Sequence, residues 1–171
     1  MILLEKIHFF WRRLLKRMEY LWAHVHLNLQ GNRIIKQTDF PSIKNPVLLI
    51  YGFATTRRVF DVLEKRLRRD GYDVFSIHLG GLFNLFNTHG IDTLAQLIRV
   101  KLDSLNKRYN IPRIHIVGHS MGGLIARHYI TELGGAERVK SLITMGVPHR
   151  GSPIAIFGIL FLGLFSRCVW Q

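Results

Sequence analysis

The sequence predicts an α/β fold, a mostly parallel sheet with flanking helices, preceded by an amphipathic N-terminal helix. Residues 47–51 form a continuous apolar run, which is typical of a strand buried on both faces of a parallel sheet. From there to residue 145, strand-like and helix-like segments alternate, as they do in folds built from βαβ units. A turn of small residues over 118–123 joins one of these strands to a helix. Together these patterns favour one sheet with right-handed crossovers.

Composition narrows the possible functions. The chain has 171 residues, with 24 Lys and Arg against 11 Asp and Glu, and its formal net charge is +13. Such a charge favours anionic partners, either a membrane surface or nucleic acid. The sequence lacks zinc-type Cys/His spacing, a phosphate-binding Gly loop and a nucleic-acid-binding motif, so we favour a membrane surface or a solvated basic face. We expect no metal and no cofactor, and the single cysteine, Cys168, excludes an internal disulfide.

Residues 1–46 are expected to form an amphipathic helix, ending near Leu29, and a polar linker. Apolar residues recur there at helical spacing: Leu4, Ile7, Trp11, Leu14, Leu15, Met18, Leu21, Trp22 and Val25. Charges interrupt every candidate apolar core, so we recognise neither a signal peptide nor a membrane span. The helix suits a membrane interface or packing on its own domain or on a partner, and both alternatives stay open.

The remaining elements follow from periodicity and from Gly or Pro breaks. We expect strands over 47–51, 73–77, 114–117 and 139–145, and helices over 57–70, 91–109 and from 121 to a stop at Gly134-Gly135. Thr55 or Thr56 is expected to cap the first of these helices, whose basic residues form a solvated face. Five residues are expected on one side of the second helix: Leu94, Leu97, Ile98, Leu102 and Leu105.

Two further segments are rich in apolar residues. The loop over 80–86 contains Phe83 and Phe86 and predicts an apolar wall near a site or ordinary core packing. Residues 154–165 carry no charge, and their length favours a cap helix or an interfacial segment over a membrane span.

The segment Gly118-His119-Ser120-Met121-Gly122 matches the G-x-S-x-G pattern of a nucleophile elbow. In such an elbow the serine occupies a strained turn between a strand and a helix. We expect glycine at 118 and 122 because the Cβ of Ser120 comes close to the backbone on either side, and Gly123 because the helix packs close to the strands. The helix N-terminus favours an oxyanion at this position. The alternative is a Gly/Ser turn in another α/β protein.

Three stretches resemble the lipase and esterase branch of the α/β-hydrolase superfamily. Residues 118–123 are similar to the G-H-S-x-G-G elbow of that branch, and residues 146–152 are similar to its G-T-P-H-x-G-S stretch. Residues 47–53 look like its first conserved strand, which ends in H-G-F, although Tyr51 replaces the histidine. The resemblance implies that residues 47–171 are the N-terminal portion of an α/β-hydrolase domain.

The resemblance also implies roles for individual residues. Ser120 is the expected nucleophile, and the backbone N–H groups of Phe53 and Met121 form the expected oxyanion hole. The elbow comprises Gly118, His119, Gly122 and Gly123, and the expected site-lining loop contains Pro148, His149 and Gly151.

The triad order of this superfamily is Ser, then Asp or Glu, then His. The acids after Ser120 are Glu132 and Glu137, and the histidines are His128 and His149. His149 is the candidate base of this set, although its position belongs to a structural loop in the resembling families. We therefore expect the triad acid and histidine to lie beyond Gln171 and the chain to be truncated.

The sequence thus predicts a lipase-like serine hydrolase that cleaves carboxylic esters, with an ester or lipid as substrate. The alternative is a catalytically impaired hydrolase-like scaffold that binds a membrane surface or a partner. A nucleic-acid binder is a third possibility that rests on charge alone. We expect the protein to be cytoplasmic or peripheral to the membrane.

Overall fold

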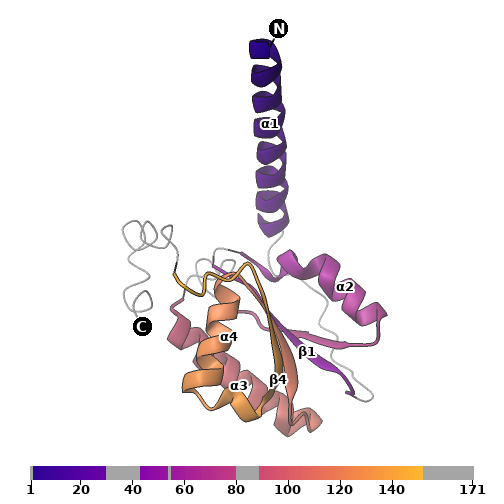
Figure 1. Ribbon diagram of the computed structural model, residues 1–171. Coiled ribbons are helices and arrows are strands. Elements are labelled where there is room, and N and C mark those ends of the chain that lie inside the picture. The colour runs from indigo at the N-terminus through magenta and orange to yellow at the C-terminus, as the bar shows by residue number, and fades with distance from the viewer. Residues whose placement is uncertain (1, 30–42, 54, 80–88, 152–171) are drawn as a thin grey trace.

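The computed structural model describes residues 2–29, 43–53, 55–79 and 89–151 (Figure 1). Four strands lie in these ranges: β1 (Pro46–Ile50), β2 (Asp73–Ser76), β3 (Ile114–His119) and β4 (Val139–Met145). The α-helices are α1 (Ile2–Leu29), α2 (Asp61–Arg69), α3 (Ile91–Tyr109) and α4 (Met121–Glu132). Two short 3₁₀ turns, η1 (Arg57–Phe60) and η2 (Gly135–Glu137), complete the order. Within these ranges, α1 included, every helix is too short or too polar to cross a membrane.

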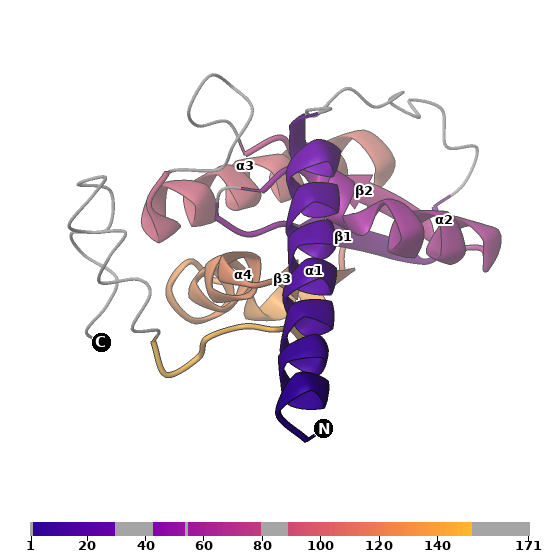
Figure 2. The same cartoon turned by 90° about the horizontal axis from the view of Figure 1, so that it is seen from above.

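The four strands form one parallel sheet in the order β2-β1-β3-β4. Right-handed crossovers from a sheet of this order place α2 on one face and both α3 and α4 on the other. The two views of the ribbon show this arrangement, with α2 on one side and α3 and α4 together on the opposite side (Figures 1 and 2). The predicted mostly parallel α/β architecture is confirmed.

The buried core lies between the sheet and the α3–α4 layer. Every residue of β1 is buried, as the continuous apolar run predicts for a central strand. Helix α3 adds Leu94, Ile98 and Leu102 to this core, and α4 adds Ile125 and Tyr129. Burial of this one continuous apolar cluster is the main term that stabilises the fold.

The bounds of α3 and β4 match the predicted ranges, but one apolar position was assigned wrongly. Leu97 is 39% exposed, whereas Leu94 and Ile98 on the same helix are buried. A residue three positions after Leu94 lies about 60° short of a full turn, on the side away from Ile98. Leu97 therefore falls outside the buried stripe.

The linker predicted to run to residue 46 is also too long. Pro46 already begins β1, and the Asp73 carboxylate accepts hydrogen bonds from the N–H groups of Lys44 (2.9 Å) and Asn45 (3.2 Å). These bonds fix the entry to β1 beside the start of β2. The predicted linker over 30–42, the apolar loop over 80–86 and the segment over 154–165 lie outside the described residues.

The helix predicted over 57–70 is divided between η1 and α2, and its expected cap is wrong. Thr56 occupies the N-cap position of η1 but makes no side-chain capping bond. The hydroxyl of Thr55 instead donates to the carbonyl oxygen of Gly52 at 3.0 Å, in the loop that follows β1.

The prediction of a solvated basic face on this segment holds for Lys65, Arg66 and Arg69 but is wrong for two arginines. The buried carboxylate of Glu64 pairs with Arg68 at 2.8 Å and with Arg57 at 3.7 Å, and Arg68 also donates to the carbonyl of Val74 at 2.7 Å. Burial lowers the pKa of the Arg57 guanidinium, which the charge of Glu64 partly offsets. These contacts attach α2 to β2 and to the segment after β1.

Tyr51, the residue that departs from the H-G-F pattern, has a structural role. Its side chain is completely buried, and its hydroxyl accepts a hydrogen bond of 2.8 Å from the backbone N–H of Leu79. This bond joins the end of β1 to the segment that follows β2.

We predict that Tyr51→Phe lowers the free energy of unfolding by about 1–3 kcal/mol, because it leaves the buried Leu79 N–H without this acceptor. Urea unfolding monitored by circular dichroism measures the change. The control is Tyr72→Phe, which removes the hydroxyl of a partly exposed tyrosine and should cost less than about 0.5 kcal/mol. Equal losses in the two variants would contradict the assigned role of the Tyr51 hydroxyl.

Candidate active site

Ser120 lies at the junction of β3 and α4, where the chain reverses sharply. Its backbone has φ 52° and ψ −126°, in a region that non-glycine residues rarely occupy, and it is the N-cap residue of α4. The Ser120 N–H donates to the carbonyl of Met145 at 2.9 Å, and the Ser120 carbonyl accepts from the N–H of Gly123 at 3.1 Å. A serine held by its neighbours in a strained conformation, with its side chain partly exposed, is the geometry of a nucleophile elbow.

The glycines of this turn are needed for reasons that differ in part from those predicted. A Cβ on Gly118 would come within 2.5 Å of the Cα of Gly123, so these two residues pack backbone against backbone. A Cβ on Gly122 would clash with the carbonyl of Ile50, which shows that α4 approaches β1 rather than the Ser120 side chain. A Cβ on Gly123 would overlap the side chain of Val147, so this glycine admits the loop after β4.

Gly52 is a site residue that the sequence analysis missed. A Cβ at this position would lie 2.8 Å from the Cβ of Ser120 and 3.2 Å from its Oγ. The register explains this proximity, because Ile50 pairs with Gly118 and the residues after β1 therefore run beside the elbow. Glycine after the first strand was the signal that could have identified it.

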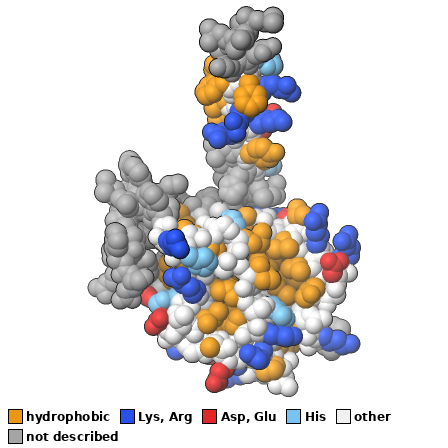
Figure 3. Space-filling view, viewed as in Figure 1, with side chains coloured by type: hydrophobic (Ala, Val, Ile, Leu, Met, Phe, Trp, Pro, Cys, Tyr) orange, Lys and Arg blue, Asp and Glu red, His pale blue; other side chains and the backbone are white. Residues whose placement is uncertain are grey.

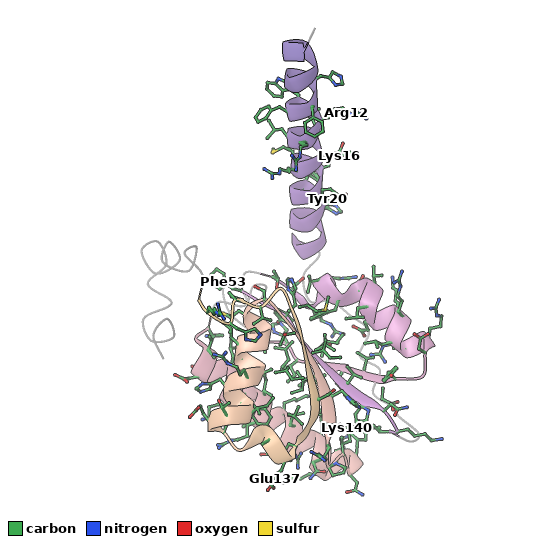
Figure 4. All side chains as sticks on the ribbon, in the orientation of Figure 1. Arg12, Lys16, Tyr20, Phe53, Glu137 and Lys140 are labelled. Carbon is green, nitrogen blue, oxygen red and sulfur yellow. The ribbon has the colours of Figure 1, made fainter. Side chains whose placement is uncertain are left out.

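The two predicted oxyanion-hole residues enter this junction from different elements. Met121 is the first residue of α4, where backbone N–H groups have no acceptor within the helix and where the helix dipole favours negative charge. Phe53 follows Gly52 in the loop after β1 (Figure 4), and the Thr55 hydroxyl closes that loop on the carbonyl of Gly52. Two such backbone donors beside a serine can stabilise the oxyanion of a tetrahedral intermediate.

The loop after β4 packs beside the elbow, as predicted for a segment at the carboxyl edge of the sheet. Val147 contacts Gly123, the N–H of His149 donates to the Val147 carbonyl at 3.0 Å, and the N–H of Gly151 donates to the Pro148 carbonyl at 3.0 Å. These short-range bonds give the loop over 146–151 a compact turn structure next to the N-terminus of α4.

The histidines that could serve as a base contact other groups. His149 is exposed and lies 3.5 Å from both the Thr144 hydroxyl and the Arg127 guanidinium. His128 on α4 forms an ion pair of 2.8 Å with Asp92 on α3.

The other two rings in this region also have partners. His119 packs edge to face on Phe60, with 6.2 Å between ring centroids. His115 hydrogen-bonds to Ser141 at 2.7 Å, and burial, with a smaller effect of the Lys140 charge, lowers the pKa of its imidazole.

These contacts assign no described histidine to Ser120, so the catalytic role considered for His149 stays a prediction. Across the residues that the structure describes, no three His, Cys, Asp or Glu side chains gather as a metal site requires.

The family model described as "alpha/beta hydrolase fold" matches residues 45–157, which include β1, the elbow and the loop after β4. The chain belongs to this family. The resemblance inferred from the elbow and from the stretch over 146–152 is therefore confirmed, and the sheet order, the helical layers and the elbow are those of a partial α/β-hydrolase fold.

Two curated relatives are named triacylglycerol lipase. The relatives from Pseudarthrobacter phenanthrenivorans and from Burkholderia plantarii are each 29% identical over 126 residues, which cover 69% of this chain. The matched residues make up 37% of the first relative and 33% of the second. The chain thus spans about a third of the length of these relatives.

Solved structures support the fold. A mature lipase from Bacillus licheniformis superposes with a TM-score of 0.58 at 19% identity, over 75% of this chain and 49% of that chain. A carboxyl esterase from Bacillus coagulans superposes with a TM-score of 0.55 at 20% identity, over 71% of this chain and 43% of that one. The chain is therefore lipase- and esterase-like in sequence and fold, and the roles of its individual site residues stay predictions.

We predict that Gly122→Ala lowers the free energy of unfolding by about 3 kcal/mol or prevents folding, because its Cβ would overlap the backbone carbonyl of Ile50. Thermal unfolding followed by circular dichroism measures this. The matched control is Gly90→Ala, at an ordinary φ of −66° with no atom within 4 Å of the added Cβ, which should cost less than about 1 kcal/mol. A Gly122→Ala variant as stable as the control would contradict the close approach of α4 to β1.

Proposed function

We propose that this chain carries the nucleophile and the oxyanion-binding groups of a serine hydrolase that cleaves carboxylic esters, and that Ser120 is the nucleophile. The observation that carries the proposal is the strained backbone of Ser120 at the N-terminus of α4, directly beside the Gly52–Phe53 loop. An ordinary Gly/Ser turn has no need for a positive φ at serine or for a loop that approaches its hydroxyl.

In the proposed reaction, Ser120 Oγ attacks the ester carbonyl carbon while a general base takes the hydroxyl proton. The carbonyl oxygen becomes an oxyanion that the N–H groups of Met121 and Phe53 stabilise. The tetrahedral intermediate collapses, the alcohol leaves with the proton from the base, and an acyl-Ser120 ester remains. Water, activated by the same base, then releases the carboxylic acid and restores Ser120.

We further propose that the substrates are lipid esters. Both curated relatives named above are called triacylglycerol lipase, which supports a substrate with a long acyl chain. The apolar segments over 80–86 and 154–165 support the same preference by composition.

Ser120→Ala should remove the ester hydrolysis that depends on the protein. Because the described histidines contact other groups, we expect slow turnover of p-nitrophenyl butyrate, increased by added imidazole as a diffusible base. The increase above the rate of free imidazole should fall at least about tenfold in Ser120→Ala. The exposed Ser104→Ala variant on α3 is the matched control and should keep it.

Equal imidazole-dependent rates for wild type and Ser120→Ala would contradict the nucleophile assignment. Such a result would support the alternative of a hydrolase-like scaffold without ester hydrolysis.

The lipid preference predicts a dependence on acyl-chain length. For p-nitrophenyl esters from butyrate to palmitate, kcat/KM in the presence of imidazole should stay level or rise, because each buried methylene adds about 0.8 kcal/mol of transfer free energy. The comparison uses the difference between wild type and Ser120→Ala at each chain length, which removes the background reaction. A steady fall with chain length would contradict the lipid preference and leave the Ser120 assignment intact.

A further inference from the structure

Helix α1 extends away from the rest of the molecule and is covered by none of it over most of its length (Figure 1). All of its described side chains are exposed, including Trp11 (55%) and Trp22 (70%). Further large apolar side chains on this helix are exposed as well: Phe9, Phe10, Leu14, Leu15, Met18 and Tyr20. Burial inside the described domain therefore does not explain why this helix is rich in apolar residues.

The exposed apolar residues are not spread evenly around α1. At about 3.6 residues per turn, Trp11, Leu14, Leu15, Met18 and Trp22 fall on one face of the helix. The opposite face carries most of the basic residues, and Arg12 and Lys16 point to one side of the helix together with Tyr20 (Figure 4). We call the first of these the apolar face of α1.

The charge of α1 has one dominant sign. Over 8–23 the basic residues are Arg12, Arg13, Lys16 and Arg17, and Glu19 is the acidic residue. The guanidinium of Arg13 lies 5.5 Å from the ring centroid of Phe9, so aromatic and cationic groups are interleaved along the helix. Hydrophobic and basic side chains stand next to each other along α1 in the space-filling view (Figure 3).

We propose that α1 binds the surface of an anionic lipid bilayer, with its apolar face in the interfacial region and its basic residues among the lipid headgroups. A helix with tryptophan and leucine on one face and arginine and lysine on the other has the composition of an interfacial helix. Tryptophan favours this region because its ring is apolar and its indole N–H needs a hydrogen-bond acceptor. The length and polarity of α1 agree with binding at the surface rather than crossing.

A second copy of the chain is a poorer partner for the same face. Two α1 helices would bring together apolar faces that are flanked on both sides by positive charge, so an approach in either orientation is repulsive. The tryptophans also do not match the β-branched and leucine residues that fill a two-stranded coiled-coil seam. An anionic surface satisfies both the apolar face and the charge.

The position of α1 relates this surface to the candidate active site. Its C-terminal end contacts η1, directly after the loop that holds Phe53. Figure 4 shows Phe53 at the end of the body from which α1 rises, with Glu137 and Lys140 at the opposite end. Binding through α1 therefore brings a bilayer to the side of the molecule that carries Ser120, although the binding itself does not depend on the proposed ester hydrolysis.

The test is flotation of the 171-residue chain with vesicles of phosphatidylcholine containing 30% phosphatidylglycerol, compared with phosphatidylcholine alone. We expect the partition coefficient to be at least about tenfold higher for the anionic vesicles in low salt. The difference should shrink as salt shortens the screening length. The fluorescence of Trp11 and Trp22, measured in a Trp170→Phe background, should shift to shorter wavelength on binding. Ser120→Ala should bind as wild type does, which separates this proposal from the proposed catalysis.

Paired variants test the two faces of α1. Trp22→Ser on the apolar face should lower the partition coefficient about tenfold, whereas Tyr20→Ser, at a side chain 75% exposed on the other face, should change it less than about threefold. Arg13→Gln with Lys16→Gln should also lower it about tenfold, and the exposed pair Lys101→Gln with Lys107→Gln on α3 is the control of equal charge. Circular dichroism checks that each variant keeps its helix content.

Three outcomes would overturn the proposal. One is no flotation of the wild-type chain with anionic vesicles, and another is equal partition into anionic and neutral vesicles. The third is a stable dimer in light scattering that Trp22→Ser converts to a monomer, which would assign the apolar face to a second copy of the chain.

Discussion

The close approach of the α4 N-terminus to the carboxyl end of β1 is the constraint on which the candidate site depends. No side chain fits between Gly122 and the carbonyl of Ile50, or between Gly118 and Gly123. The helix must therefore begin directly after β3, and Ser120 makes the reversal with a positive φ that costs of the order of 1–3 kcal/mol. The buried sheet and the bond from the Ser120 N–H to Met145 offset that cost.

The same constraint aligns groups that are far apart in the sequence. Once β1 and β3 are paired in register, Gly52 must pass beside the Ser120 side chain, and the N–H of Phe53 follows it. The Thr55 hydroxyl then holds this loop through the carbonyl of Gly52. The hydroxyl of Tyr51 supports the loop from the other side through Leu79, a function that a histidine at this position would have to perform with a shorter side chain. The candidate oxyanion hole is thus a product of strand register and two side-chain hydrogen bonds.

Local patterns were enough to predict the strands, the bounds of α3 and β4, and the elbow, because each depends on periodicity or on turn residues next to one another. The contacts between segments were not predictable in this way. Which residue crowds Gly123, which carboxylate pairs with Arg57, and which hydroxyl closes the loop at Gly52 all depend on how separate elements cross. The partners of His149 have the same origin, since Thr144 and Arg127 belong to β4 and α4. A single sequence carries no local trace of such crossings.

Two exposed apolar surfaces of the protein differ in what can cover them. Strand β4 is at the end of the described sheet, and Ile143 and Met145 on it are exposed. One side of its backbone faces no strand within the described sheet, so it needs water or another strand as a hydrogen-bond partner, and acyl chains supply neither. Helix α1 satisfies its backbone internally, so its apolar face can leave water for lipid without that cost. Backbone hydrogen bonding therefore makes α1, and not the edge at β4, the surface suited to a bilayer.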